Sequence, residues 1–403
     1  MKPSIEVERV ILAHVGRRHD PFYLYDTGVI RATCRKLAAL PYPVCSVHFA
    51  CMANTHPTFL GIVKDEGLSL FVNSLPHLRQ AMAMGFTGEQ IVFAASAMDE
   101  PTMRAVRDAG AKVNLDSLKQ VARWQQMFPG VPFGIRCNIG GLIEAKKTRG
   151  GYFIGRESRL GMTPEEFLTL AGDRQITGLH LYVGTDITDI DYFYRCYKIL
   201  ADFSVEFPAL TYLDVGGGFG LQDEEGREFD IHHYGLLADA FMRHVSGRLG
   251  RPIRMILEPG RLIGARAGWF VCRVTDTKQR GKRQLIGVNA SSAQFPRPLF
   301  YPDSARHPVT LLHANATLNG KPELPTSVYG CSTYSRDFLA HDVVLPRAEI
   351  GDMIVLGDAG SYCAAAYTHF LGFPQPREIF DDCEARSRQE TTADVLFHPA
   401  SGV

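Results

Sequence analysis

Leu213-Asp214-Val215-Gly216-Gly217-Gly218-Phe219-Gly220 is the stretch around which the chain is organised, an apolar run that ends in three consecutive glycines. Because glycine has no Cβ, the backbone can turn sharply here and bring its N–H groups close to an anion. At the C-terminal end of a strand, such a turn is suited to binding phosphate. A tight strand-to-helix turn without a ligand gives the same pattern. Two later motifs favour the phosphate site: Glu258-Pro259-Gly260-Arg261 and Asp358-Ala359-Gly360-Ser361-Tyr362.

The composition is that of an ordinary globular chain. Its 403 residues predict two domains, and the 43 Lys+Arg residues balance the 43 Asp+Glu residues. This balance argues against a nucleic-acid or membrane-surface partner. No apolar run approaches the ~20 residues that span a bilayer, and the N-terminus has no apolar signal core, so we expect a cytoplasmic location. The nine cysteines are scattered without a CxxC pair, which is typical of reduced thiols, and no metal-ligand cluster is found.

Strand-length runs alternate with helix-length segments over the first two thirds of the chain. The eight runs are 46–50, 68–72, 90–94, 112–115, 132–136, 176–181, 210–213 and 254–257. Helical periodicity is clearest over 58–66, 75–84, 116–127, 164–171 and 190–207. This alternation favours an α/β fold, the (β/α)8 TIM barrel, over an open doubly wound sheet. We expect the barrel to occupy residues 30–262.

After residue 262, short strand-like pieces dominate and no long amphipathic helix intervenes. They are 268–275, 284–289, 309–312, 326–329 and 352–357. Residues 22–26 predict a strand leading into a helix that Asp26 caps. We therefore expect a C-terminal β domain that the N-terminal segment completes, comprising residues 1–29 and 263–403, with a loose tail over 391–403.

The working residues of a barrel lie where its strands end. Reading those ends gives 50–54, Asn73, 95–96, Asp116, Arg136, His180 with Tyr182, 216–218 and 258–261. The last two groups come from neighbouring strands, so Arg261 can neutralise a phosphate bound by the glycines. Glu258 can pair with a protonated ring nitrogen, or it forms a structural ion pair with a nearby arginine.

Taken in order, these motifs resemble the fold-type III pyridoxal-phosphate-dependent decarboxylases. This alanine-racemase-like group includes ornithine, arginine and diaminopimelate decarboxylases. The matching landmarks are 49–54, 115–117, 134–136, 158–161, 178–180, 216–220, 258–261, 297–298 and 358–362. Each landmark is a weak signal by itself, but their shared order across residues 20–380 is specific.

The resemblance implies pyridoxal 5′-phosphate as cofactor and gives each matching residue a role. The cofactor-binding residues would be Gly216, Gly217, Gly218, Glu258, Gly260, Arg261, Tyr362, Arg136 and His180, and the substrate-binding residues Arg297 and Asp337. The glycines, Arg261 and the Tyr362 hydroxyl would hold the phosphate, while Glu258 would keep the pyridine nitrogen protonated. Arg136 would lie beside the phenolic edge. A homodimer is implied, with residues near 332–337 completing the partner's site.

The chain departs from the family at Met52, which stands where the family has its Schiff-base lysine. Methionine has no amine, and Lys64 is expected within the next helix. Packing of an apolar side chain at a strand end is the simpler interpretation of Met52. The residue is either an engineered substitution or natural divergence, and further departures nearby favour divergence.

Three of those departures concern the same region. Tyr182 replaces the histidine that stacks on the cofactor, although tyrosine can also stack. The family's catalytic cysteine falls at Thr333, and Cys331 lies two residues earlier, where it either serves instead or is merely packed. His77 stands where a glutamate is common. The candidate catalytic positions are therefore Thr333, Cys331, Tyr182 and Met52.

These observations predict a decarboxylase for an amino acid or amino-acid conjugate, with pyridoxal phosphate bound non-covalently and an altered mechanism. Residues 370–376 resemble the subgroup that acts in siderophore and other secondary-metabolite pathways. Two alternatives stay open. One is a non-catalytic protein that binds pyridoxal phosphate or another phosphorylated ligand, and the other is a cofactor-independent lyase or isomerase.

Overall fold

The computed structural model describes residues 3–15, 20–144, 153–302, 305–313 and 322–381, so the expected tail at 391–403 lies outside the described residues. The chain divides into two compact units. One is Arg31–Ile263, and the other joins Met1–Ile30 to Gly264–Val403. Among the described residues, no helix combines the length and the apolar character needed to cross a membrane.

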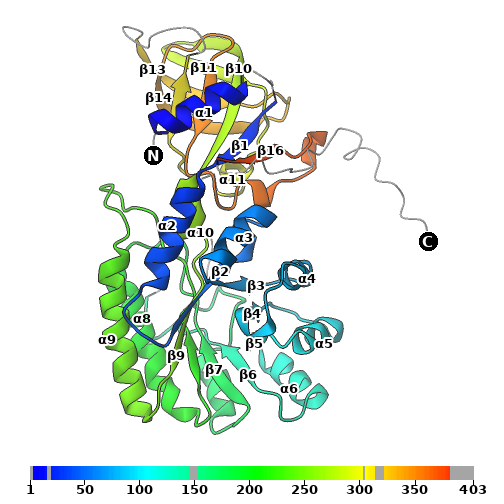
Figure 1. Cartoon of the computed structure of the whole chain (residues 1–403), viewed down its shortest axis with the longest axis vertical. Coiled ribbons are helices and arrows are strands. Elements are labelled where there is room, and N and C mark those ends of the chain that lie inside the picture. Colours follow the sequence, from blue (N-terminus) through cyan, green and yellow to red (C-terminus); the bar gives the residue numbers. More distant parts are fainter. Residues whose placement is uncertain (1–2, 16–19, 145–152, 303–304, 314–321, 382–403) are drawn as a thin grey trace, which may run out of the picture. The chain divides into compact units, whose positions relative to one another are not determined.

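The unit Arg31–Ile263 is a closed barrel of eight parallel strands, with helices on its outside (Figure 1). The strands are β2 (Cys45–Ala50), β3 (Ser69–Val72), β4 (Ile91–Ala94), β5 (Lys112–Leu115), β6 (Phe133–Arg136), β7 (Ile176–His180), β8 (Tyr212–Asp214) and β9 (Arg254–Leu257). The barrel closes where β9 pairs with β2, with Cys45 opposite Met255. The predicted (β/α)8 barrel is confirmed.

The helices of the barrel begin at identifiable caps. They are α2 (Thr27–Ala38), α3 (Pro57–Asp65), α4 (Leu75–Ala83), α5 (Glu100–Asp108), α6 (Leu118–Met127), α7 (Pro164–Phe167), α8 (Ile190–Phe203), α9 (Ile231–Leu249) and α10 (Arg261–Gly264). Asp26 accepts the N–H of Val29 at 2.9 Å, as predicted. The helix expected over 116–127 starts later because the Ser117 side chain caps it. The helix expected over 190–207 ends at Phe203 and tightens into a 3₁₀ turn, Ser204–Glu206.

The Tyr212 side chain reaches across the barrel interior and begins a chain of buried hydrogen bonds. A Cβ on Gly178 would lie 1.8 Å from the Tyr212 ring, so only glycine leaves room for that ring. The Tyr212 hydroxyl donates to Asn114 Oδ1 at 2.9 Å. Packing at the barrel centre therefore fixes polar groups that point toward the carboxyl ends of the strands.

The unit made from the two chain ends is built on an eight-stranded sheet, in the path order β12-β15-β10-β11-β13-β14, with β1 and β16 off the path. Its elements are α1 (Ile5–Val15), β1 (Phe22–Tyr25), β10 (Gly268–Arg280), β11 (Arg283–Val288), α11 (Arg297–Phe300), β12 (Val309–Leu312), β13 (Glu323–Tyr329), β14 (Phe338–Pro346), β15 (Met353–Leu356) and β16 (Arg377–Phe380). Strand β1 pairs with β10, so the N-terminal segment does complete this β domain.

Four elements of this unit were not predicted: α1, α11, β14 and β16. The signal for α1 was present, because Val7 and Ile11 lie four residues apart and both pack into the core. Strand β14 is largely half-buried or exposed, so its sequence lacks a continuous apolar pattern.

Glu378 of β16 makes the stability of this unit depend on pH. Its Oε2 accepts the Tyr25 hydroxyl at 2.6 Å, and burial raises its pKa from 4.5 to about 7. Because the folded state then binds more protons than the unfolded state, the free energy of unfolding falls as pH rises from roughly 4.5 through 7. We expect Glu378→Gln to unfold with a free energy about 3 kcal/mol higher than wild type at pH 8, and nearly equal to wild type at pH 4.

Denaturant titrations at the two pH values measure this difference. The control is Glu206→Gln, which changes an exposed carboxyl and should leave the pH dependence unchanged. Parallel pH profiles for wild type and Glu378→Gln would contradict the prediction.

Candidate cofactor site at the carboxyl ends of the barrel strands

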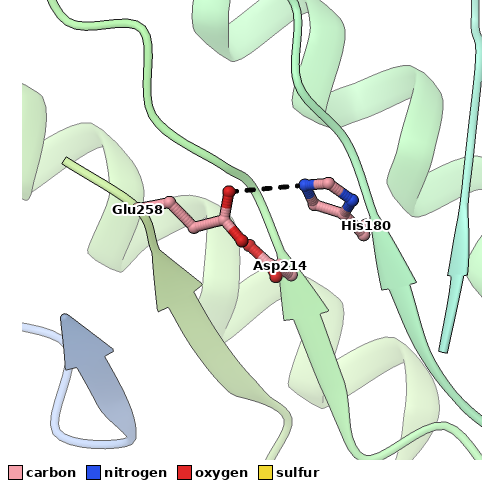
Figure 2. A group of neighbouring side chains, drawn as sticks. All are labelled: His180, Asp214 and Glu258. Atoms are coloured by element: carbon pink, nitrogen blue, oxygen red, sulfur yellow. Dashed lines mark ion pairs between the residues drawn. The ribbon is translucent and has the colours of Figure 1, made fainter. Parts of the chain in front are cut away.

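Three consecutive strand ends bring His180, Asp214 and Glu258 together. His180 ends β7, Asp214 ends β8, and Glu258 follows β9. One ligand atom from each lies within 4.8 Å of the others, and all three residues are buried (Figure 2). No metal site was predicted from the sequence, and that stays a prediction. The three donors are far apart in sequence, so only barrel closure reveals a group that could also hold a metal ion.

Asp214 is fixed by hydrogen bonds on both carboxyl oxygens. Its Oδ2 accepts Asn114 Nδ2 at 2.9 Å, and its Oδ1 accepts the N–H of Gly216 at 3.1 Å. Burial, followed by the charge of Glu258, raises the pKa of Asp214 well above its ordinary value. The network that starts at Tyr212 thus ends on an acid that packs beside Glu258.

Glu258 is buried, and one of its oxygens receives no N–H group from a described residue. Its Oε2 lies 3.5 Å from His180 Nε2, and apart from a proton that the carboxyl shares with Asp214, its Oε1 has no hydrogen-bond partner within the described part of the chain. Burial raises the pKa of Glu258 to about 7 and lowers the pKa of His180 to about 4. An unpartnered buried carboxyl oxygen is costly, so it points to a ligand that would pair with it. Among the described residues Glu258 forms no direct ion pair with an arginine, although the charge of Arg136 is close enough to lower the pKa of Glu258.

Arg136 lies at the end of β6 and faces acids. Its Nε is 3.9 Å from Asp116 Oδ1, and its side chain is nearly buried. Burial lowers the pKa of Arg136, while Asp116 and Glu258 oppose that shift. Asp116 itself accepts the Ser96 hydroxyl at 2.6 Å and the N–H of Gly161 at 2.9 Å. These hydrogen bonds therefore fix the Asp116 carboxylate beside Arg136.

The glycine run forms a cradle that a side chain would fill. Gly216 and Gly218 have φ values of 68° and 89°, which favour glycine. A Cβ on Gly217 would lie 2.1 Å from the Glu258 carbonyl, and one on Gly218 would lie 2.0 Å from the Gly184 carbonyl. Across the described residues, the N–H groups of Gly217 and Gly218 have no hydrogen-bond partner. These two N–H groups can donate hydrogen bonds to a phosphate oxygen.

Arg261 follows Gly260 at the start of α10 and already has an acidic partner. Its Nη1 lies 2.6 Å from Asp186 Oδ1, while its Nε is buried and lacks a partner among the described residues. Sequence reading missed Asp186. The available signal was an acid in the loop that leaves β7, three residues after Val183.

Met52 lies in the 3₁₀ turn Cys51–Ala53, directly after β2, and is half-buried. Lys64 lies in α3 as expected, and its Nζ donates to the Met84 carbonyl at 2.9 Å. The Tyr182 ring packs edge-on against Phe153, with 5.1 Å between centroids. His77 lies in α4, where burial lowers its pKa. The Lys64 amine is thus hydrogen-bonded to the C-terminal end of α4.

The other candidates belong to the unit built from the chain ends. Thr333 and Cys331 are exposed in the loop that Asp337 organises. The buried Asp337 carboxylate accepts the N–H groups of Ser292 (2.6 Å) and Ser332 (3.1 Å), so both of its oxygens already accept hydrogen bonds. Contact between Asp337 and substrate stays a prediction, and this arrangement weakens it.

Arg297 and Tyr362 also lie in this second unit. Arg297 is buried at the start of α11, and its guanidinium lies over the Tyr301 ring. Tyr362 follows β15 with a left-handed φ of 57°. The roles of Arg297 in substrate binding and of Tyr362 in phosphate binding stay predictions.

A family model described as "Pyridoxal-dependent decarboxylase, pyridoxal binding domain" matches residues 28–265. The chain belongs to this family. The diaminopimelate decarboxylase of Escherichia coli K12 is 28% identical over 401 residues, covering 93% of each chain. The diaminopimelate decarboxylase of Streptomyces coelicolor is also 28% identical, covering 96% of this chain and 90% of the relative.

Solved structures of decarboxylases share this fold. A crystal structure of diaminopimelate decarboxylase superimposes with a TM-score of 0.85 at 25% identity, covering 96% of this chain and 95% of that one. The lysine/ornithine decarboxylase of Vibrio vulnificus, complexed with putrescine, gives 0.78 at 22% identity, covering 94% and 98%.

Pyridoxal phosphate is the cofactor of the pyridoxal-dependent decarboxylases, which confirms the cofactor predicted from the sequence. The barrel of this chain has polar groups whose positions suit pyridoxal phosphate. The unpartnered N–H groups of Gly217 and Gly218 and the buried Nε of Arg261 suit a phosphate. The unpartnered Oε1 of Glu258 suits the ring nitrogen. Hydrogen-bonding groups for both ends of the cofactor therefore lie at adjacent strand ends, N–H donors for the phosphate and a carboxylate acceptor for the ring nitrogen.

Proposed function

We propose that this protein is a carboxy-lyase that removes carbon dioxide from an amino acid or an amino-acid conjugate, with pyridoxal phosphate held without a covalent lysine link. The observation that carries the proposal is the unpartnered Glu258 oxygen beside a glycine cradle whose N–H groups are also unpartnered. Met52, directly after β2, supports a cofactor that is not covalently bound, because the methionine side chain has no amine.

When bound, pyridoxal phosphate supplies an electron sink for the charge left on the substrate carbon as carbon dioxide departs. Glu258 would hold a proton at the ring nitrogen, helped by the low dielectric of its buried position. Gly217, Gly218 and Arg261 would bind the phosphate. Asp214 would keep Glu258 in place, because hydrogen bonds from Asn114 and Gly216 orient it.

The remaining residues would complete the site as the family resemblance suggests. Arg136 would border the phenolic edge of the cofactor, and the Tyr182 ring would cover one face. Thr333 or Cys331 would return a proton to the substrate carbon, and Arg297 would pair with a substrate carboxylate. A homodimer with shared sites is part of this proposal.

Diaminopimelate is the first substrate to test, because relatives that match most of this chain are diaminopimelate decarboxylases. Lysine, ornithine, arginine and citryl conjugates of diamines follow, the last because residues 370–376 suggest secondary metabolism. The test is carbon dioxide release from each compound with added pyridoxal phosphate. Saturable binding without any release would favour the non-catalytic alternative, and absence of binding would favour the cofactor-independent one.

Arg261→Ala should weaken binding of pyridoxal phosphate by roughly 1.5–3 kcal/mol, because a charge-assisted hydrogen bond is lost. Absorbance titration of the apoprotein measures this change. Arg248→Ala is the matched control, since Arg248 forms an exposed ion pair with Asp202 on the outer helix α9. Equal affinities for Arg261→Ala and wild type would move the phosphate away from this cradle.

A further inference from the structure

Asp186 places a carboxylate beside Arg261, the arginine at the start of α10 that follows the end of β9. The Asp186 Oδ1 to Arg261 Nη1 distance is 2.6 Å, and the Arg261 side chain is largely buried whereas Asp186 is about one-third exposed. A short ion pair with a nearly buried arginine is stronger than a typical surface pair. The Asp186 carboxylate therefore already occupies a position beside Arg261 that an anionic ligand could take.

The loop that carries Asp186 is held against the cradle by the backbone. The N–H of Ile187 donates to the Gly218 carbonyl at 2.9 Å, and the N–H of Gly220 donates to the Ile187 carbonyl at 2.8 Å. Asp186 also has a φ of 55°, a left-handed conformation that costs energy for any residue other than glycine. The carboxylate thus lies beside Arg261 because two hydrogen bonds fix the backbone on its C-terminal side.

This arrangement opposes a phosphate in either of two positions. A phosphate that takes Nη1 of Arg261 must displace the carboxylate and break this ion pair. A phosphate that takes the free Nε instead lies close to the carboxylate and is repelled by it. In both cases the cost comes from the negative charge of Asp186.

We propose that Asp186 is a built-in competitor for Arg261 that lowers the affinity of the glycine cradle for a phosphate group, so that pyridoxal phosphate remains exchangeable. This inference rests on the proposed binding of the cofactor phosphate at Gly217, Gly218 and Arg261. It adds that the charge of Asp186, together with the lack of an amine at Met52, makes cofactor release part of how the protein works.

The test compares wild type with Asp186→Asn and Asp186→Gly, both of which remove the charge and tolerate a left-handed backbone. Three ligands are titrated into the apoprotein: pyridoxal phosphate, inorganic phosphate and pyridoxal, which lacks the phosphate. We expect both variants to bind the two phosphate ligands about tenfold more tightly, with slower cofactor loss on dialysis, and to bind pyridoxal as wild type does.

Asp239→Asn is the matched control, because it removes the same charge from an exposed ion pair with Arg243 on α9. It should change none of the three affinities. If the Asp186 variants bind pyridoxal phosphate equally or more weakly while Arg261→Ala still loses affinity, Asp186 orients Arg261 and the inference is overturned, with the proposed function intact. If no variant and not even wild type binds pyridoxal phosphate saturably, the proposed function and the inference fall together.

Discussion

Met52→Lys should give the protein a visible absorption band with pyridoxal phosphate that wild type lacks, and borohydride should then fix the cofactor to residue 52. The reason is geometric. Met52 follows β2 at the carboxyl end of the first barrel strand and is half-buried, so a lysine of similar length can reach the barrel mouth. Decarboxylation should rise by about 10²- to 10⁴-fold, the usual contribution of a positioned proton-transfer group.

The control for this experiment is Met52→Leu, which keeps an apolar side chain without an amine. It should show neither the band nor the gain in rate. If Met52→Lys folds and binds pyridoxal phosphate yet forms no borohydride-stable link, position 52 does not face the cofactor, and the covalent site of the family lies elsewhere in this chain. A wild-type protein that already shows a lysine-linked band would equally contradict the proposal.

The barrel could be predicted because its signal is local. Each strand is a short apolar run, and polar caps such as Ser117 mark where helices begin. The end of α8 was overestimated, since the 3₁₀ turn that follows it has the same side-chain periodicity as a helix over one turn. Strand β14 was missed because its pairing with β13, and not its own burial, makes it a strand.

The candidate site was predictable residue by residue but not as an arrangement. The glycine run and Glu258 stand out as motifs, whereas the approach of His180 to Glu258 depends on which strands become neighbours. Asp186 had no motif at all, because its role arises from an ion pair with a residue 75 positions later. Likewise, the hydrogen bond from Asn114 to Asp214 crosses the barrel interior and joins residues 100 positions apart.

Glu258→Gln should lower the rate of decarboxylation by about 10²-fold or more, because a neutral amide cannot stabilise positive charge at the ring nitrogen as a carboxylate does. The same variant makes a prediction that does not depend on activity. Burial raises the pKa of Glu258 to about 7 in the apoprotein, above its value in the unfolded chain. Its ionisation therefore costs stability as pH rises through that range, and apo Glu258→Gln should unfold at a higher temperature than wild type at pH 8.

Cofactor binding should reverse that order. A protonated ring nitrogen beside Glu258 favours the ionised carboxylate, so pyridoxal phosphate should raise the unfolding temperature of wild type at pH 8 more than that of Glu258→Gln. Thermal unfolding with and without cofactor measures both effects.

Glu378→Gln supplies the matched control, because Glu378 is a second buried carboxyl whose pKa is also raised to about 7, and it lies in the unit of the chain ends. This control should gain apo stability at pH 8 while keeping the full response to pyridoxal phosphate. The two glutamates would then differ only in whether the cofactor partners their charge. An equal cofactor response in Glu258→Gln, Glu378→Gln and wild type would mean that the ring nitrogen does not meet Glu258, and the unpartnered oxygen in the barrel mouth would require another ligand.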